Sequence, residues 1–65
     1  MATLKEARFA RGWTQWDLKL RSGVHVTRIS LFEQGYTLPT VKEKEALAIA
    51  LEVPADDLVF KIKTT

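Results

Sequence analysis

Three threonines, each followed three positions later by an acidic residue, determine where helices begin in this chain. The pairs are Thr3 with Glu6, Thr14 with Asp17, and Thr40 with Glu43. In such a capping box the threonine oxygen accepts a hydrogen bond from an otherwise unpaired N–H of the first turn, and the acid stabilises the positive end of the helix. The sequence therefore predicts three helices that start at these threonines.

Glycines predict where the first two of these helices end, because glycine adopts the left-handed backbone conformation that closes many helices. We expect the first helix to cover residues 3–11 and to stop at Gly12. The second should cover residues 14–21 and stop at Ser22-Gly23.

A further helix follows almost at once. Residues 26–33 are predicted to form it, and Gly35 closes it. Only residues 23–25 separate this helix from the one before. Residues 14–33 are therefore predicted to form a helix, a tight turn and a second helix.

Two prolines organise the rest of the chain. Pro39 cannot continue a helix and favours extended structure in the residue before it, so residues 35–39 should be a loop. A helix over residues 40–51 then follows. Pro54 suits the first turn of a last short helix that runs through Leu58.

Apolar residues at helical spacing supply one contiguous core. They are Leu4, Ala7, Trp13, Leu18, Val24, Ile29, Phe32, Val41, Leu47, Ala48, Leu51, Val53 and Leu58. We therefore expect one all-α domain over residues 1–59, a compact bundle of four to five helices. Residues 60–65 form its tail, in which the alternation of apolar and polar side chains from Phe60 to Lys63 indicates an extended segment or an edge strand.

The size of the chain restricts its function class. A domain of 65 residues buries only about 60% of the surface that its unfolded chain exposes, which leaves little material for a deep substrate cavity. The chain has no cysteine, no run of about 18 apolar residues that could span a bilayer, and no apolar secretory signal at its start. We expect a cytoplasmic binding module rather than an enzyme.

Basic residues concentrate in the first part of the sequence. Residues 1–28 carry six Lys or Arg and two Asp or Glu, whereas residues 29–65 carry four and six. This asymmetry fits a surface that faces a polyanion, and it fits a scattered solvated surface equally well.

The residues around the predicted tight turn resemble a known DNA-binding motif. They are Thr14, Gln15, Leu18, Gly23, Val24, Ile29, Ser30, Glu33, Gly35 and Pro39. In type and spacing they are similar to the helix-turn-helix of the Cro and lambda-repressor-like family, also called Xre-type regulators. The resemblance implies a repressor-like transcriptional regulator that binds double-stranded DNA with the helix of residues 26–33 in the major groove.

The resemblance also implies roles for single residues. The positions that would read bases are Val26, Thr27, Arg28, Ser30 and Leu31, and those that would contact phosphates are Thr14, Gln15, Lys19, Gly35, Tyr36 and Lys42. Arg8 and Glu33 correspond to a partly buried structural ion pair. Arg28 is the strongest charged contact, to a guanine or to a phosphate. Its replacement by Ala is expected to weaken DNA binding and to leave thermal unfolding nearly unchanged.

Two positions depart from the family pattern. Lys19 stands where the family usually has a small residue, so its stem would pack while its ammonium reaches solvent or a phosphate. Leu31 stands where a polar or basic residue is common. Val26, Thr27 and Leu31 meet thymine methyls but form few hydrogen bonds with base edges, so sequence discrimination is either weak or dependent on DNA shape.

The sequence gives no support for catalysis or for a cofactor. His25 has no second His or Cys at ligand spacing, so it either caps the following helix or approaches the DNA backbone. The acidic neighbours Glu43 with Glu45 and Asp56 with Asp57 do not face one another on a helix and form no catalytic pair. We expect no enzymatic activity, no metal and no cofactor.

Related regulators read palindromic operators as dimers, so we expect a homodimer with recognition helices roughly 34 Å apart. Its interface is either the last short helix with Phe60 and Ile62, or a patch that includes Ile49. The alternative function is an antitoxin-like or adaptor module with the same fold. Such a module would bind another protein through Trp16, Leu20 and Leu31.

Overall fold

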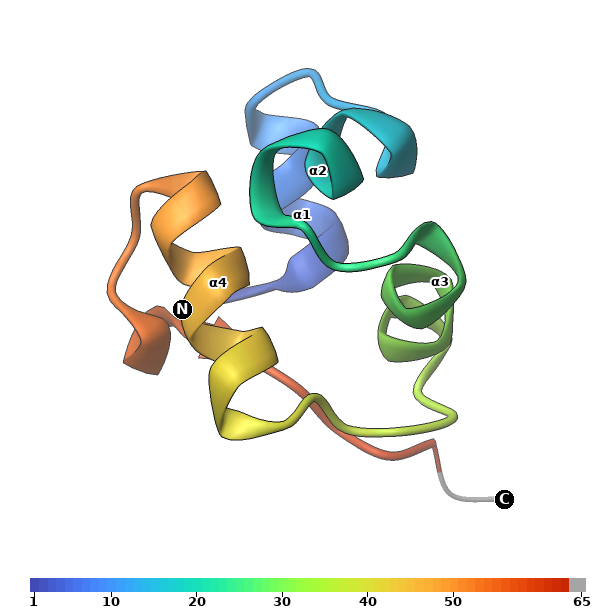
Figure 1. Cartoon of the computed structure of the whole chain (residues 1–65). Coiled ribbons are helices and arrows are strands. Elements are labelled where there is room, and N and C mark those ends of the chain that lie inside the picture. Colours follow the sequence, from blue (N-terminus) through green and yellow to red (C-terminus); the bar gives the residue numbers. More distant parts are fainter. Residues whose placement is uncertain (64–65) are drawn as a thin grey trace.

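Each predicted capping box begins a helix. The computed structural model describes residues 1–63, which contain four α-helices (Figure 1). Their bounds are α1 (Leu4–Ala10), α2 (Gln15–Ser22), α3 (Val26–Gln34) and α4 (Val41–Leu51). Thr3, Thr14 and Thr40 cap α1, α2 and α4, and both hydrogen bonds of each box are present. The predicted all-α fold class is confirmed.

A histidine caps the remaining helix. The Nδ1 atom of His25 accepts a hydrogen bond from the backbone N–H of Thr27 at 3.1 Å, at the start of α3. Of the two expectations for this lone histidine, the structure bears out the capping role.

Glycines end α2 and α3 as predicted, but α4 ends at a different residue type. Gly23 and Gly35 have φ angles of 78° and 80°, in the left-handed region that glycine occupies without steric penalty. The cap of α4 is Glu52, at a φ of 57°. Arg11 holds this end in place, since its Nη2 donates to the carbonyl of Leu51 at 2.7 Å and its Nη1 lies 3.1 Å from the carboxylate of Glu52.

A short parallel sheet joins two segments that are far apart in the sequence. Strand β1 (Ala2–Thr3) pairs with β2 (Leu58–Val59), with Ala2 opposite Leu58 and Thr3 opposite Val59. One turn of 3-10 helix, η1 (Ala55–Asp57), leads into β2.

The short helix ends one residue earlier than predicted, and the strand lies just before the residues for which an extended segment or an edge strand was expected. Leu58 belongs to β2 and not to the helix, and the strand precedes the alternating residues 60–63, because the register with β1 ends at Val59. The last part of the predicted tail, residues 64–65, lies outside the described residues.

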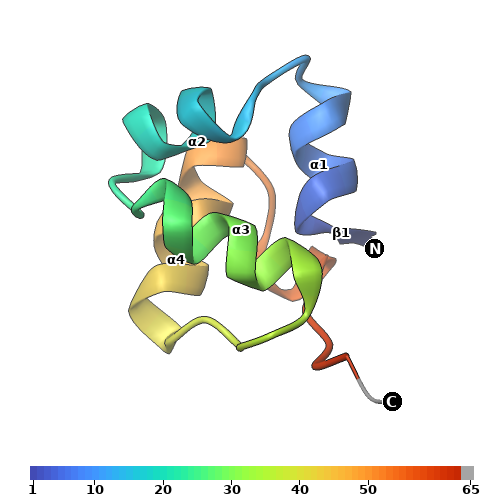
Figure 2. The same ribbon diagram turned by 90° about the vertical axis from the view of Figure 1, so that its right-hand side faces the viewer.

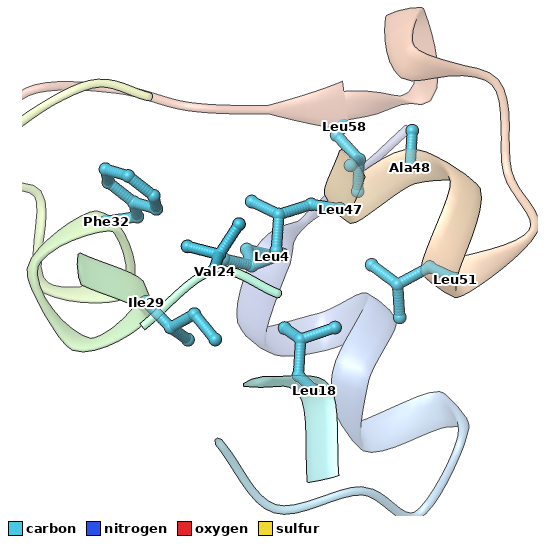
Figure 3. Close-up of a cluster of buried hydrophobic side chains, with 9 residues drawn as sticks. All are labelled: Leu4, Leu18, Val24, Ile29, Phe32, Leu47, Ala48, Leu51 and Leu58. Atoms are coloured by element: carbon cyan, nitrogen blue, oxygen red, sulfur yellow. The ribbon is translucent and has the colours of Figure 1, made fainter. Parts of the chain in front are cut away.

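All four α-helices and β2 contribute buried side chains to a single core (Figure 3). Val24, in the turn between α2 and α3, also belongs to this core. The buried residues are Leu4, Leu18, Val24, Ile29, Phe32, Leu47, Ala48, Leu51 and Leu58. Ala7, Trp13 and Val53 are partly buried against this core. The prediction for Val41 was wrong, since its side chain is 74% exposed. Val41 is the first residue of α4, and the buried residues of that helix begin only at Leu47.

The turn between α2 and α3 sets the position of α3 on the molecule. Val24 is 6% exposed and belongs to the core, so it anchors residues 23–25 against the body of the domain. Figure 1 shows α3 on one side of the molecule, and Figure 2, in which that side faces the viewer, shows α3 lying across it. Among the described residues, no helix is both long and apolar enough to cross a membrane.

Candidate nucleic-acid interface

One face of α3 is buried and the opposite face points outward. Ile29 and Phe32 belong to the core. Thr27 and Gln34 are exposed, and Leu31 between them is partly exposed. The spacing of residues 27, 31 and 34 places them on one side of a helix, so they form an outward stripe along α3. Val26 and Ser30, which are partly exposed, flank this stripe.

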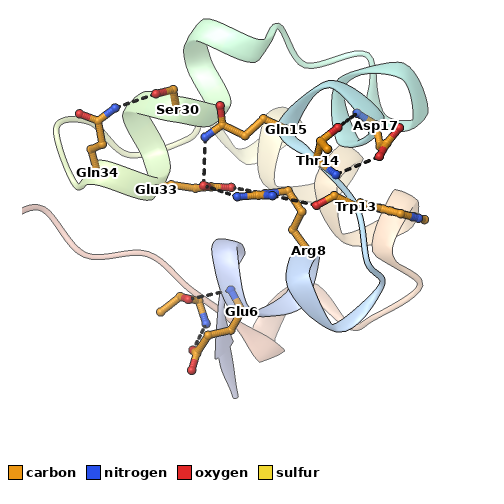
Figure 4. Close-up of polar contacts among 10 residues, drawn as sticks. Glu6, Arg8, Trp13, Thr14, Gln15, Asp17, Ser30, Glu33 and Gln34 are labelled. Carbon is orange, nitrogen blue, oxygen red and sulfur yellow. Dashed lines mark hydrogen bonds and ion pairs between the residues drawn. The ribbon is translucent and has the colours of Figure 1, made fainter.

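Gln34 belongs to this stripe but was not among the predicted site residues. Its Nε2 donates a hydrogen bond to the hydroxyl oxygen of Ser30 at 2.6 Å (Figure 4). An amide side chain can form two hydrogen bonds with an adenine edge, which the apolar side chain of Leu31 cannot do. Its spacing of seven positions from Thr27 is the sequence signal that would have identified it.

Arg28 points away from the outward stripe and toward α4. Its Nε and Nη2 donate to the carboxylate of Glu43 at 3.0 and 2.8 Å, and its guanidinium lies 5.0 Å from the centre of the Phe32 ring. The bonds from Arg28 and the N–H of Thr40 lower the pKa of Glu43 to about 2. Arg28 therefore takes part in the scaffold, which sequence reasoning did not foresee.

The predicted ion pair between Arg8 and Glu33 is present and buried. The Nε and Nη2 atoms of Arg8 donate to Glu33 at 2.7 and 2.9 Å, and its Nη1 donates to the carbonyl of Trp13 at 2.8 Å (Figure 4). The two side chains are 7% and 5% exposed. The hydrogen bonds that Arg8 donates to Glu33 raise the pKa of Arg8, so the guanidinium stays charged. The pair therefore ties α1 to the last turn of α3.

Gln15 is drawn into the same cluster. Its Nε2 donates to the Oε1 atom of Glu33 at 3.1 Å (Figure 4). This bond fixes the first turn of α2 against the end of α3. A phosphate contact through the side-chain amide of Gln15 would therefore use the same nitrogen that already donates to Glu33.

Thr14 is likewise engaged within the protein. Its hydroxyl accepts from the N–H of Asp17 at 3.1 Å, and its own N–H donates to the carboxylate of Asp17 at 2.9 Å. These bonds lower the pKa of Asp17. The first turn of α2 therefore carries a carboxylate, which partly opposes a phosphate at this place.

Backbone groups of the α3–α4 loop are also engaged. The N–H of Tyr36 donates to the carbonyl of Leu31 at 3.0 Å and that of Gly35 to the carbonyl of Phe32 at 3.3 Å. These bonds close α3. The Tyr36 side chain, which is 62% exposed, remains suited to a phosphate contact.

Two lysines complete the predicted phosphate set. The ammonium of Lys19 lies 4.1 Å from the centre of the Trp16 ring, in a cation–π contact at the surface of α2. Lys42 is exposed in the first turn of α4. Both are on the surface, one on the helix before α3 and one on the helix after it.

Exposed apolar side chains lie outside the stripe. Trp16 and Leu20 are 55% and 63% exposed, four positions apart on α2, and Ile49 on α4 is 76% exposed. Phe60, in contrast, packs edge-on against Phe32 with ring centres 6.2 Å apart. Phe60 is therefore partly buried against the core of its own chain.

A cavity beside the sheet is small for a small-molecule ligand. A cavity of about 190 Å³ lies beside the sheet and is lined by Thr3, Leu4, Phe32, Glu33, Val59, Phe60 and Lys61. Ligand pockets are usually about 300 Å³ or larger. Within residues 1–63, no three His, Cys, Asp or Glu side chains are grouped as metal ligands would be.

The comparisons with known proteins agree with this geometry. Residues 4–58 match the family model HTH_3, which is described as helix-turn-helix. The match covers all four helices and extends to the first residue of β2. No curated protein matches the chain.

Proposed function

Because the chain belongs to the Xre and lambda-repressor-like helix-turn-helix family of DNA-binding regulators, we propose that it is a small transcriptional regulator that reads double-stranded DNA with α3. The observation that carries the proposal is the outward stripe of Thr27, Leu31 and Gln34. The opposite face of the same helix is fixed in the core by Ile29 and Phe32. A helix held in this way can enter a major groove, which is about 12 Å wide.

Direct base reading is proposed for the stripe and its neighbours. Val26, Thr27 and Leu31 suit the methyl groups of thymine, and Ser30 with Gln34 supply hydrogen-bonding groups. Arg28 reaches a guanine or a phosphate only at the edge of this surface, since its guanidinium is bonded to Glu43. Because Val26 and Leu31 form no hydrogen bonds with base edges, a part of the specificity is assigned to DNA shape.

Phosphate contacts are proposed on both sides of α3. The side chains proposed to contact phosphates are those of Lys19, Tyr36 and Lys42. The main role proposed for Thr14, Gln15 and Gly35 is to hold the helix ends that face the DNA backbone. Such contacts orient α3 in the groove but carry no sequence information.

We further propose that the protein binds a palindromic operator as a homodimer in the cytoplasm and acts as a repressor by occupying that site. Two-fold dimers of this motif place their recognition helices about 34 Å apart, one turn of DNA. The dimer contact is proposed either through the segment that carries Ile62 or through a patch that includes Ile49, and both side chains are exposed. Phe60 contributes less to it because of its contact with Phe32.

A second function has one specific observation in its favour. Trp16 and Leu20 form an exposed apolar pair on α2, and aromatic residues such as Trp16 are enriched at protein interfaces. An antitoxin-like or adaptor module would bind a partner protein through this pair and Leu31. Salt separates the two functions, because DNA binding weakens steeply with salt and apolar protein binding does not.

Selection from random duplexes tests the proposal. We expect recovery of a preferred motif, and we expect Thr27→Ala and Gln34→Ala to relax the preference at single positions without loss of stability. The matched control is Trp16→Ala, which should keep the preference. Failure to retain duplex DNA at low salt, together with retention of a protein partner that Trp16→Ala abolishes, would favour the adaptor function.

A further inference from the structure

The segment of residues 60–63 lies against the end of the recognition helix and carries two lysines. We propose that this segment is a basic arm of the DNA interface, in which Lys61 and Lys63 bind phosphates beside the end of α3. The inference rests on the proposed function and names a contact that extends it. None of the residues predicted to contact DNA lies in this segment.

Two contacts fix the arm on the domain. Phe60 packs edge-on against Phe32, the last core residue of α3. The N–H of Lys63 then donates to the carbonyl of Gly35, the cap of α3, at 2.6 Å. The arm is therefore attached to the same helix that the proposal places in the groove.

Gly35 allows the arm to approach this closely. A Cβ atom at this position would lie 2.9 Å from the backbone nitrogen of Lys63 and 3.1 Å from the carbonyl oxygen of Lys61. Both neighbours are backbone atoms, so they have little freedom to move away. The glycine thus has two structural uses here, the left-handed cap of α3 and the docking of the arm.

The arm emerges on the side of the molecule where α3 is exposed. Figure 1 shows the segment passing beneath the α3–α4 loop and emerging below α3. In Figure 2, which faces this side, it emerges at the end of α3 where that helix joins the loop. A DNA strand that borders a groove filled by α3 would pass this place.

The charges at this end of α3 also favour a phosphate contact by the arm. Glu33, the acidic residue of the last turn, is neutralised by Arg8, and the last turn of α3 contains no basic residue of its own. Lys61 and Lys63 are both exposed. Their long stems let the ammonium groups reach a nearby phosphate while the backbone stays docked on Gly35.

A purely structural use of the two lysines predicts a different result. Cations near the C-terminal end of a helix stabilise it. If that were their function, removing both charges would lower stability and leave the salt dependence of DNA binding unchanged. A phosphate contact predicts the reverse, since each phosphate neutralised contributes about 0.9 to the slope of log binding constant against log salt.

The test measures that slope for the full chain on a mixed-sequence duplex. We expect the slope of Lys61→Gln/Lys63→Gln to be smaller than that of the unchanged protein by about 1.8, with an unchanged urea midpoint. Lys61→Arg/Lys63→Arg keeps both charges and should keep the slope. Lys5→Gln, which removes an exposed charge on α1, is the control for position and should also keep it.

The outcomes separate this inference from the proposed function. A steep slope in the unchanged protein with the same slope in the double Gln variant overturns the arm and leaves the regulator in place. An equal loss per charge in Lys5→Gln also overturns the arm, because the effect would then follow net charge and not position. If the unchanged protein shows no salt-dependent duplex binding, both the proposed function and the arm are wrong.

Discussion

Arg28 on α3 and Glu43 on α4 form a two-bond ion pair, with distances of 3.0 and 2.8 Å. The Oε1 atom of Glu43 also accepts from the N–H of Thr40 at 2.9 Å, so the same carboxylate caps α4. The pair therefore joins the start of α3 to the start of α4. Arg28 was expected only to contact DNA, but it also joins α3 to α4 in the folded domain.

Replacing Arg28 is consequently expected to affect two properties. Arg28→Ala should lower the urea midpoint slightly, because the pair is partly exposed, and should weaken duplex binding. Glu43→Gln is the matched control, since glutamine still serves in a capping box while the ion pair is lost. It should lower the midpoint to a similar extent and leave DNA binding intact. Equal losses of DNA binding in both variants would mean that Arg28 acts only through the scaffold.

The same pair makes stability depend on acid pH. The pKa of Glu43 is lowered from 4.5 to about 2 in the folded protein. Its contribution to stability is therefore fully present above about pH 4.5 and is lost as the pH falls toward 2. Unfolding midpoints measured across this range should fall less steeply in Glu43→Gln and in Arg28→Ala. A part of the decline should remain, because the pKa values of Glu6 and Asp17 are lowered by their capping bonds.

The buried pair of Arg8 and Glu33 should be costly to break from one side. Glu33→Ala leaves the guanidinium of Arg8 without its carboxylate, at a site where the side chains are 7% and 5% exposed. We expect a loss of about 3–5 kcal/mol in the free energy of unfolding, measured in urea. Arg8→Met/Glu33→Leu removes both charges and should recover most of that loss. Additive losses in the double variant would contradict this account.

The cap of α4 should improve with glycine. Glu52 adopts a φ of 57°, which costs an ordinary residue roughly 1–2 kcal/mol. Glu52→Gly should therefore raise the free energy of unfolding by about 1 kcal/mol, since the Glu52 side chain is 74% exposed and its pair with Arg11 contributes little. Glu52→Gln keeps the strained backbone without the charge and should not be stabilised. Equal stabilisation of both variants would assign the effect to charge.

Helix positions were predictable because the signals for them are local. A threonine three positions before an acid specifies a helix start through bonds within one turn, and Gly23 and Gly35 specify two of the ends in the same way. The helix-turn-helix arrangement followed from the short spacing between the glycine that ends α2 and the start of α3. The pair of Arg8 with Glu33 followed from the family resemblance.

The features that sequence reasoning missed depend on residues far apart in the chain. The partner of Arg28 lies 15 positions away, and the partner of Gly35 is Lys63. The strand at Leu58–Val59 exists because Ala2–Thr3 lies beside it, a pairing with no local pattern. Glu52 adopts the left-handed conformation that glycine usually takes, because the chain turns at the end of α4. Arg11, far away in the sequence, supports this end through its bond to the carbonyl of Leu51.

The most direct test of the central claim is the map of backbone amide resonances that move when the protein is titrated with duplex DNA. We predict that the amides of Thr27, Leu31 and Gln34 shift most, with Gln15 and Tyr36 at the two flanks. Amides near Ile49 should stay in place. Shifts confined to the neighbourhood of Leu20 and Ile49, with α3 unchanged, would contradict the claim that α3 is the surface that meets DNA.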